Sequence, residues 1–281
     1  MQLAIASGKG GTGKTTIAVA LSLIADCPVT YLDCDVEEPN GAIFLKPHFT
    51  EEQKVNVLIP EFDPTRCTCC GECARFCQFN ALSIAKKPLL FEELCHSCGG
   101  CARVCPEGAI TEIEREIGKV QVGRTDRVRV VQGTLNVGKV LSPVLIRAVR
   151  THSTPDSLTI IDCPPGMACP LTAAIDGVDF VLLVSEPTSF GLHDLKLTIE
   201  TIQSQKIQFA VLVNRANIGD NHLVDWCHSQ EIPILLEILE QRSLAEAGSR
   251  GQHLLTACSE LQPQLKEVLY RIEELNKEHS T

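Results

Sequence analysis

The chain has 281 residues, 44% of them hydrophobic and 21% charged, a composition that is typical of a folded protein and excludes a largely disordered one. Its length suits one large α/β domain, or a medium domain joined to a small one. The net charge of −10 and the aromatic content of 4% argue against a nucleic-acid partner, because phosphate neutralisation needs basic residues and base stacking needs aromatic ones.

Cysteine is unusually frequent, with 15 residues, of which nine lie in the cysteine-rich stretch 67–105. The chain opens with no signal-peptide pattern and contains no apolar run long enough for a membrane span. We therefore expect a cytoplasmic protein without stable membrane insertion. Disulfides are rare in that compartment, so clustered thiols indicate metal or redox chemistry.

The amino-terminal segment predicts a strand over residues 2–6, a glycine-rich turn and a buried helix over residues 17–24. A second strand over residues 29–32 ends at Asp33-Cys34-Asp35. The following cysteine-rich segment is rich in turn residues and poor in periodic runs. We interpret residues 60–117 as a small inserted domain.

After the insertion, strands and helices alternate. We predict strands over residues 129–133, 158–161, 180–184, 209–213 and 234–236, and helices over residues 143–150, 192–202 and 259–276. This alternation predicts an α/β fold, a mostly parallel sheet flanked by helices, that binds its ligand at the carboxyl ends of the strands. Asp35, Asp162 and Asn214 lie at those ends. The last helix has one apolar face, which we expect to dock on the core.

The segment Gly8–Thr15 fits the phosphate-binding pattern G-x-x-x-x-G-K-[ST] between a strand and a helix. Successive backbone N–H groups of such a loop point at phosphate oxygens, and the helix N-terminus adds partial positive charge. Lys14 is expected to reach the β- and γ-phosphates, and Thr15 to bind Mg²⁺. The expected nucleotide-binding residues of the loop are Gly8, Gly10, Gly11, Thr12, Gly13, Lys14, Thr15 and Thr16.

With its second lysine, Lys9, this loop resembles the deviant P-loop of the MinD, ParA, Mrp/ApbC and nitrogenase iron protein superfamily of ATPases. The resemblance implies an ATP-dependent homodimer or related heterodimer, in which Lys9 reaches the partner's nucleotide. It also implies that Asp35 orients the attacking water, that Asp162 holds the Mg²⁺ water shell and that the Gly166 amide senses the γ-phosphate. Asn214 stands at the adenine-reading position. ATP is favoured over GTP because Asn217 replaces the acidic residue of guanine readers.

The cysteine-rich segment contains an internal duplication. Cys67, Cys70, Cys73 and Cys77 have the spacing C-x₂-C-x₂-C-x₃-C, which Cys95, Cys98, Cys101 and Cys105 repeat. In this pattern three thiolates bind one [4Fe–4S] cluster, and the fourth binds the cluster of the other half. We therefore expect one cluster on Cys67, Cys70, Cys73 and Cys105, and the other on Cys95, Cys98, Cys101 and Cys77. Zinc is the competing metal, although structural zinc pairs generally stand further apart.

The segment resembles a bacterial two-cluster ferredoxin, including Pro106 after the last cysteine, and departs from it at Gln78, where proline would stand. The resemblance implies a ferredoxin-like domain over residues 60–117 inserted into a P-loop ATPase domain of residues 1–59 and 118–281. Cys69 matches Ser97 in the repeat and is not an expected ligand. Cys169 is a candidate ligand of a third, intersubunit cluster, although it is more simply explained as a small buried hydrophobic residue.

These features together predict an ATPase that couples its nucleotide state to low-potential electron transfer through two [4Fe–4S] clusters, toward an unidentified redox partner protein. Two alternatives remain open. The first is an ATP-dependent carrier or maturation factor for iron–sulfur clusters. The second is a MinD- or ParA-like positioning ATPase whose clusters sense the redox state.

Overall fold

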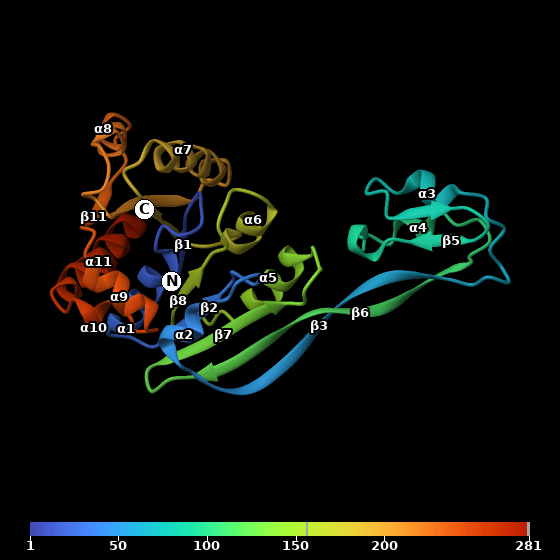
Figure 1. Ribbon diagram of the computed structural model, residues 1–281, viewed down its shortest axis with the longest axis horizontal. Coiled ribbons are helices and arrows are strands. Elements are labelled where there is room, and N and C mark those ends of the chain that lie inside the picture. Colours follow the sequence, from blue (N-terminus) through green and yellow to red (C-terminus); the bar gives the residue numbers. More distant parts are fainter. Residues whose placement is uncertain (156, 280–281) are drawn as a thin grey trace.

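The computed structural model describes residues 1–155 and 157–279, and its framework is one large sheet (Figure 1). Within these residues the sheet has nine strands, in the order β11-β10-β9-β1-β8-β2-β7-β6-β3. The strands from β11 to β7 are parallel, whereas β6 and β3 run antiparallel at one edge. In spatial order the bounds are β11 Ile234–Ile238, β10 Gln208–Asn214, β9 Phe180–Ser185, β1 Gln2–Ala6, β8 Leu158–Asp162, β2 Val29–Asp33, β7 Val128–Leu135, β6 Ile110–Arg124 and β3 His48–Phe62.

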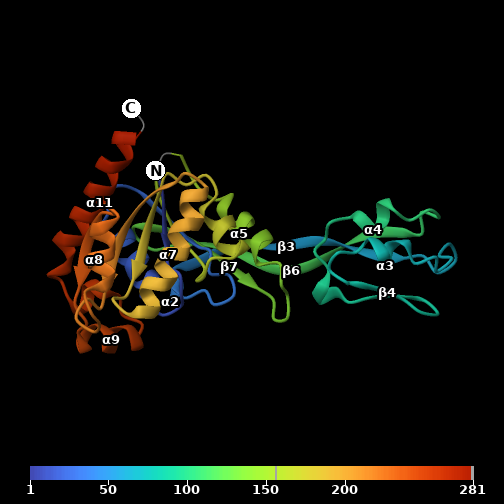
Figure 2. The same cartoon turned by 90° about the horizontal axis from the view of Figure 1, so that it is seen from above.

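Helices cover both faces of this sheet (Figure 2). The buried side chains of one face form a cluster with those of α5 (Ser142–Arg150), α6 (Cys169–Ile175), α7 (Ser189–Ser204) and α8 (His222–Ser229). The other face packs against α1 (Lys14–Ile24), α2 (Gly41–Leu45), α9 (Arg242–Ser249), α10 (Leu254–Ala257) and α11 (Leu261–His279). The central strands β1, β8, β2 and β9 are apolar along their length because both of their faces are covered.

The expected α/β architecture with a mostly parallel sheet is confirmed, and the predicted strands and helices after residue 118 end within a few residues of the observed ones. The predicted docking of the last helix is also confirmed, since Leu265, Val268 and Ile272 of α11 are buried in the core. Among the described helices, none has both the length and the apolar content needed to cross a bilayer.

Strands β3 and β6 form a long two-stranded ribbon that sequence analysis missed. They pair along their whole lengths, from His48↔Arg124 to Phe62↔Ile110, but β7 supports only residues 118–124 of β6. Beyond that support, Val55, Val57 and Ile59 of β3 are buried and alternate with exposed residues, whereas β6 is exposed over residues 111–114. The alternation in β3 is typical of a half-buried strand, but β6 has no such pattern there. The boundaries expected at residues 59/60 and 117/118 fall inside these two strands.

The ribbon carries an outer unit of residues 63–109 at its far end (Figure 1). This unit contains α3 (Glu72–Phe76), β4 (Leu82–Ile84), β5 (Pro88–Leu90), the short 3₁₀ helix η1 (Glu92–Leu94) and α4 (Gly100–Arg103). Its core cluster has three buried residues, Cys73, Leu82 and Ile110. On the side of the large sheet, Lys139 Nζ lies 3.9 Å from a carboxylate oxygen of Glu92.

The buried centre of β8 gives a direct test of this packing. Ile160 has no exposed surface, so Ile160→Ala should lower the free energy of unfolding by about 2–5 kcal/mol through lost burial and a residual cavity. Ile43, which is 53% exposed, is the matched control, and Ile43→Ala should change the free energy of unfolding by about 0.5 kcal/mol or less. Urea titration followed by the fluorescence of Trp226, the single tryptophan, measures both. Equal effects of the two substitutions would contradict this assignment of the core.

Candidate functional site

The phosphate-binding loop connects β1 to α1 at the carboxyl edge of the sheet, where it was expected. Gly11 and Gly13 have φ values of +79° and +95°, in the left-handed region that glycine adopts without strain. A Cβ on Gly13 would lie 2.5 Å from Nδ2 of Asn214, so this position also needs the absence of a side chain. Gly13 caps α1 without a side-chain hydrogen bond, which leaves the first N–H groups of the helix available for an anion.

Two buried carboxylates lie beside this loop. Asp33 and Asp162 are paired in register across β2 and β8, and both are almost fully buried. Burial raises the pKa of Asp162, and the Lys14 ammonium and the side chains of Thr15 and Tyr31 oppose that rise. Oδ1 of Asp162 is buried and has no hydrogen-bond partner within the described chain. Such an oxygen is suited to accept from a water molecule of a Mg²⁺ shell.

Asp35, two residues after the end of β2, lies near Lys14 and Asp162. Burial raises the pKa of its carboxyl to about 6, while the Lys14 ammonium acts in the opposite direction and Asp162 in the same one. The structure therefore brings Lys14, Thr15, Asp35 and Asp162 together, as the sequence pattern predicts. A carboxylate that titrates near neutral pH can accept a hydrogen bond from an attacking water, and perturbed groups of this kind are common at functional sites.

Lys9 is held by its own chain. Its Nζ lies 2.9 Å from Oε2 of Glu186, a residue at the end of β9 that is 5% exposed. The other oxygen of Glu186 is 2.5 Å from Nη1 of Arg215, and Nε of Arg215 lies 2.9 Å from Glu240. Glu186 was not predicted from sequence, because it carries no motif and is recognisable only by its position after a buried strand. Lys9 must leave this ion pair before it can reach a second subunit.

Two other groups that were expected to contact the nucleotide form hydrogen bonds with the phosphate-binding loop and the residue before it. The Gly166 N–H donates to the carbonyl of Ser7 at 3.2 Å, and Nδ2 of Asn214 donates to the carbonyl of Thr12 at 2.8 Å. Asn217 bonds to the backbone of Glu240, which fixes the loop after β10. Asn214 thus braces the phosphate-binding loop. Its predicted contact with adenine remains a prediction.

The eight repeated cysteines line two separate cavities in the outer unit. We call the cavity lined by Cys77, Cys95, Cys98 and Cys101 the inner cysteine site. The cavity lined by Cys67, Cys70, Cys73 and Cys105 is the outer cysteine site, and Cys69 also lines it. Each cavity therefore combines three cysteines of one half with the fourth cysteine of the other half. This is the division that the crossed ligation pattern predicts.

The two halves also share their backbone geometry. Cys69 and Ser97 have φ values of +55° and +53°, and Gly71 and Gly99 have φ values of +82° and +70°. Backbone N–H groups are directed at sulfur, as from Ala109 to Sγ of Cys105 at 3.3 Å. Such hydrogen bonds favour thiolates and tune iron–sulfur clusters. The Cys69 thiol instead donates to the carbonyl of Lys86 at 3.8 Å.

All 15 cysteines are free thiols. Among the described residues, no group of three or more His, Cys, Asp or Glu side chains is arranged around a point that would hold a single metal ion. Cys34, Cys163 and Cys227 are buried in the core, in accord with a structural role. Cys27 and Cys169 are exposed, so the expectation of a small buried residue at Cys169 is wrong.

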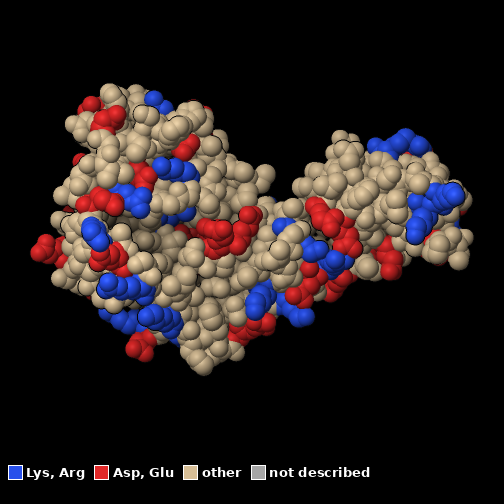
Figure 3. All heavy atoms as spheres, viewed as in Figure 1, with Lys and Arg blue, Asp and Glu red and all other residues tan. Residues whose placement is uncertain are grey.

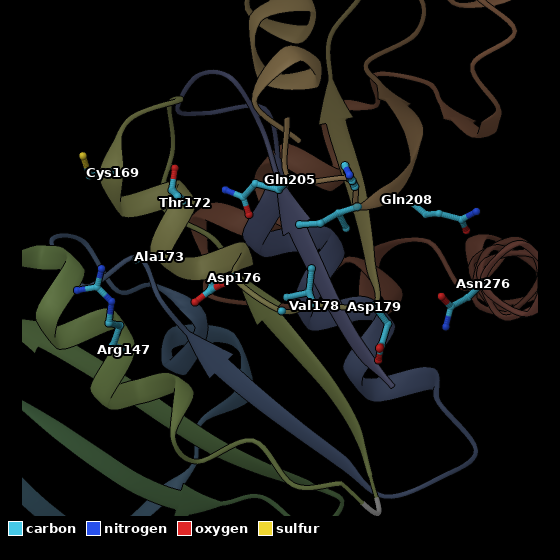
Figure 4. Close-up of a pocket in the computed structure, with 13 residues that line it drawn as sticks. Arg147, Cys169, Thr172, Ala173, Asp176, Val178, Asp179, Gln205, Gln208 and Asn276 are labelled. Carbon is cyan, nitrogen blue, oxygen red and sulfur yellow. The ribbon is translucent and has the colours of Figure 1, made fainter. Parts of the chain in front are cut away.

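Cys169 lies at the rim of an open groove of about 780 Å³ between α5, α6 and residues 205–208 (Figure 4). Val178, Asp179 and Gln208 line this groove just before or at the starts of β9 and β10, at the edge of the sheet opposite to the phosphate-binding loop. The groove contains none of the residues expected to bind nucleotide or the two clusters.

Comparison with protein families supports the nucleotide-binding assignment. Residues 3–255 match the family described as the CobQ/CobB/MinD/ParA nucleotide binding domain. Two proteins of Methanocaldococcus jannaschii are similar to this chain. The uncharacterized protein MJ0578 is 33% identical over 227 residues, covering 78% of this chain and 80% of the relative. The uncharacterized protein MJ0579 is 27% identical over 234 residues, covering 78% and 82%.

Solved structures show the same fold at low identity. The septum site-determining protein MinD of Pyrococcus horikoshii, complexed with Mg-ADP, has a TM-score of 0.59 and 17% identity, covering 98% of this chain and 96% of that one. A ParA family ATPase of Chlorobium tepidum also has a TM-score of 0.59, with 13% identity and coverage of 96% and 97%. Since its own phosphate-binding loop and almost its whole length agree with these comparisons, the chain belongs to the CobQ/CobB/MinD/ParA nucleotide-binding family.

Proposed function

We propose that this protein binds and hydrolyses ATP with Mg²⁺ and couples its nucleotide state to electron transfer through two [4Fe–4S] clusters in the outer unit. One observation supports the second part above all others. Two cavities are each lined by four of the repeated cysteines, and each set of four combines the two halves of the duplicated sequence. Within the outer cysteine site, Cys73 lies near Cys70 and Cys105. Within the inner cysteine site, Cys95 lies near Cys98 and Cys77.

The small core of the outer unit supports bound clusters on independent grounds. Its buried apolar residues are Cys73, Ala81, Leu82 and Ala109, together with Ile110 at its base, which is little apolar burial for a unit of residues 63–109. Domains of this size usually need disulfides or metal to fold. Its cysteines form no disulfides, and metal binding is the other source of stability that thiols can supply. The clusters would supply one-electron redox chemistry to this unit.

The nucleotide chemistry in this proposal depends on four side chains. Lys14 stabilises charge on the β- and γ-phosphates, while Thr15 and Asp162 hold Mg²⁺ and its water shell. Asp35 orients the attacking water, which its ionisation near pH 6 allows at neutral pH. Release of Lys9 from Glu186 supplies the cation that a second subunit needs, because two facing polyphosphates repel one another.

A chain of contacts supports coupling between the two sites. The carbonyl of Val36, next to Asp35, accepts from the N–H of Leu135 at 2.8 Å, at the end of β7. The loop after β7 then reaches the outer unit. A further cavity there, which shares Cys95 with the inner cysteine site, is lined by Lys139, Leu141 and Cys95. A nucleotide-dependent shift of the segment at Asp35 can therefore change the packing and hydration around Cys95. Hydration and hydrogen bonding tune the potential of a cluster.

The outer end of the molecule is suited to an acidic redox partner. Figure 3 shows Lys and Arg side chains at the end of the outer unit farthest from the sheet. Arg66, Lys86 and Lys87 are exposed, and they lie close to the outer cysteine site, since Arg66 precedes Cys67 and the carbonyl of Lys86 accepts from Cys69. The chain as a whole carries a charge of −10. A local patch of positive charge would steer a protein with an acidic surface toward that site.

The comparisons favour a different function, that of a MinD- or ParA-like positioning ATPase, in which the proposed clusters would sense the redox state. The similar solved structures include MinD cell-division proteins and a ParA family ATPase, although identities below 20% show the fold alone. ATP-dependent binding to liposomes or to another surface would support this alternative. A cluster carrier is the third candidate, and loss of iron during ATP turnover would distinguish it from an electron-transfer protein.

The main proposal predicts that nucleotide shifts the reduction potential of at least one cluster. Anaerobically purified protein should be titrated with dithionite and followed by electron paramagnetic resonance, with and without a non-hydrolysable ATP analogue. Lys14→Ala is the control, since it should keep its iron but lose the shift. Equal potentials with and without nucleotide in the wild type would contradict gating through the potential.

The crossed cysteine sites predict a pattern of iron loss. The wild type should contain about eight irons per chain, and Cys70→Ser or Cys98→Ser should each lose about four. The double variant Cys70→Ser/Cys105→Ser should lose no more than Cys70→Ser, because both residues line the outer cysteine site. Cys69→Ser should keep both clusters. Elemental analysis with visible absorption measures this, and two zinc ions per chain without charge-transfer absorption would refute the redox proposal.

The ion pair of Lys9 predicts a defect that is confined to the dimer. Lys9→Ala should bind ATP almost normally but fail to dimerise with a non-hydrolysable analogue, as measured by sedimentation. Lys54→Ala is the control, because Lys54 also pairs with a carboxylate, at 2.8 Å, but lies on the ribbon. A wild type that stays monomeric with the analogue, or a Lys9→Ala variant that dimerises equally well, would rule out the intermolecular role.

A further inference from the structure

The side chain of Tyr31 reaches the nucleotide site from inside the core. Tyr31 lies in the middle of β2, has no exposed surface and packs in the cluster that includes α1 and α11. Its hydroxyl donates a hydrogen bond to Oδ2 of Asp162 at 2.8 Å. The other oxygen of that carboxylate, Oδ1, is equally buried and has no partner within the described chain. One oxygen of Asp162 is therefore held, while the other remains available for a ligand.

The position of the hydroxyl is restricted on its other side by Gly41, the first residue of α2. A Cβ on Gly41 would lie 2.3 Å from the Tyr31 hydroxyl oxygen, which is too close for any side chain. The N–H of Gly41 donates to Oδ2 of Asp33 at 2.9 Å, so this glycine is itself fixed in place. The hydroxyl is thus confined between Asp162 and the start of α2.

We propose that Tyr31 is a positioning residue for the magnesium ion of the nucleotide site. By holding Oδ2, its hydroxyl keeps the Asp162 carboxylate in one orientation, with Oδ1 directed toward the Mg²⁺ water shell. A hydroxyl-to-carboxylate hydrogen bond is strong where water is excluded. Residues that orient a metal ligand in this way typically contribute 10- to 100-fold to metal affinity. The inference rests on the proposed role of Asp162 in Mg²⁺ binding.

The test separates nucleotide binding with Mg²⁺ from nucleotide binding without it. Tyr31→Phe removes only the hydroxyl and keeps the buried ring. In a titration with a fluorescent ATP analogue, this variant should bind as the wild type does in EDTA. It should need about 10-fold more Mg²⁺ for half-maximal tightening. A purely structural defect would weaken binding equally under both conditions.

Three further variants make the result decisive. Tyr270→Phe, which alters the exposed second tyrosine of the chain, should change neither measurement. Gly41→Ala should displace the hydroxyl and reproduce the Mg²⁺ defect of Tyr31→Phe by a different route. Asp162→Asn should abolish the effect of Mg²⁺. If Asp162→Asn loses the tightening of nucleotide binding by Mg²⁺ and Tyr31→Phe responds to Mg²⁺ as the wild type does, the positioning role of Tyr31 is wrong. If Mg²⁺ tightens binding equally in Asp162→Asn and the wild type, the proposed magnesium site itself fails.

Discussion

The register between β2 and β8 is the constraint on which the nucleotide site depends. These parallel strands end together, so Asp33 and Asp162 are brought side by side at the edge where the phosphate-binding loop begins α1. Burial of both carboxylates is costly unless their oxygens are bound. The hydroxyl of Tyr31 donates to Oδ2 of Asp162, and the N–H groups of Gly41 and Asp35 donate to Asp33. Oδ1 of Asp162 is left for a ligand. A shift of one residue along either strand would turn one carboxylate to the opposite face.

The same edge of the sheet leads into the ribbon that carries the outer unit. Asp35 follows β2, Gly41 begins α2, and β3 starts three residues after α2 ends. The chain therefore passes directly from the proposed magnesium site to the proposed clusters. A two-stranded ribbon is weakly stabilised by itself, and cross-strand pairs such as Lys119 with Glu52 add little at the surface. Contact of Lys139 and Leu141 with the outer unit gives the two parts a second connection.

The family relationship and the cysteine pattern are separate lines of evidence. The family model spans residues 3–255, and the MinD and ParA structures cover 98% and 96% of this chain, but their low identity limits the inference to the fold. The duplicated cysteines lie in the outer unit, where pairing of the halves is visible in the two cavities. The outer unit needs a source of stability beyond its small core, and this need, rather than the comparisons, is the argument for bound clusters.

Much of this protein could be predicted from sequence because its signals are local. The phosphate-binding loop depends on consecutive glycines and a lysine, and the buried strands are continuous apolar runs that need no knowledge of their neighbours. The duplicated cysteine spacing is local as well, and its crossed division into two sets agrees with the cavities. In the ribbon, Val55, Val57 and Ile59 alternate with exposed residues, but the antiparallel partner of this strand lies beyond the outer unit in the chain, so the pairing itself is not a local signal. The ion pair of Lys9 with Glu186 and the hydrogen bond of Tyr31 to Asp162 join residues more than 100 positions apart. Only the tertiary structure could decide them, because the order of strands in the sheet determines which chain segments meet at its carboxyl edge.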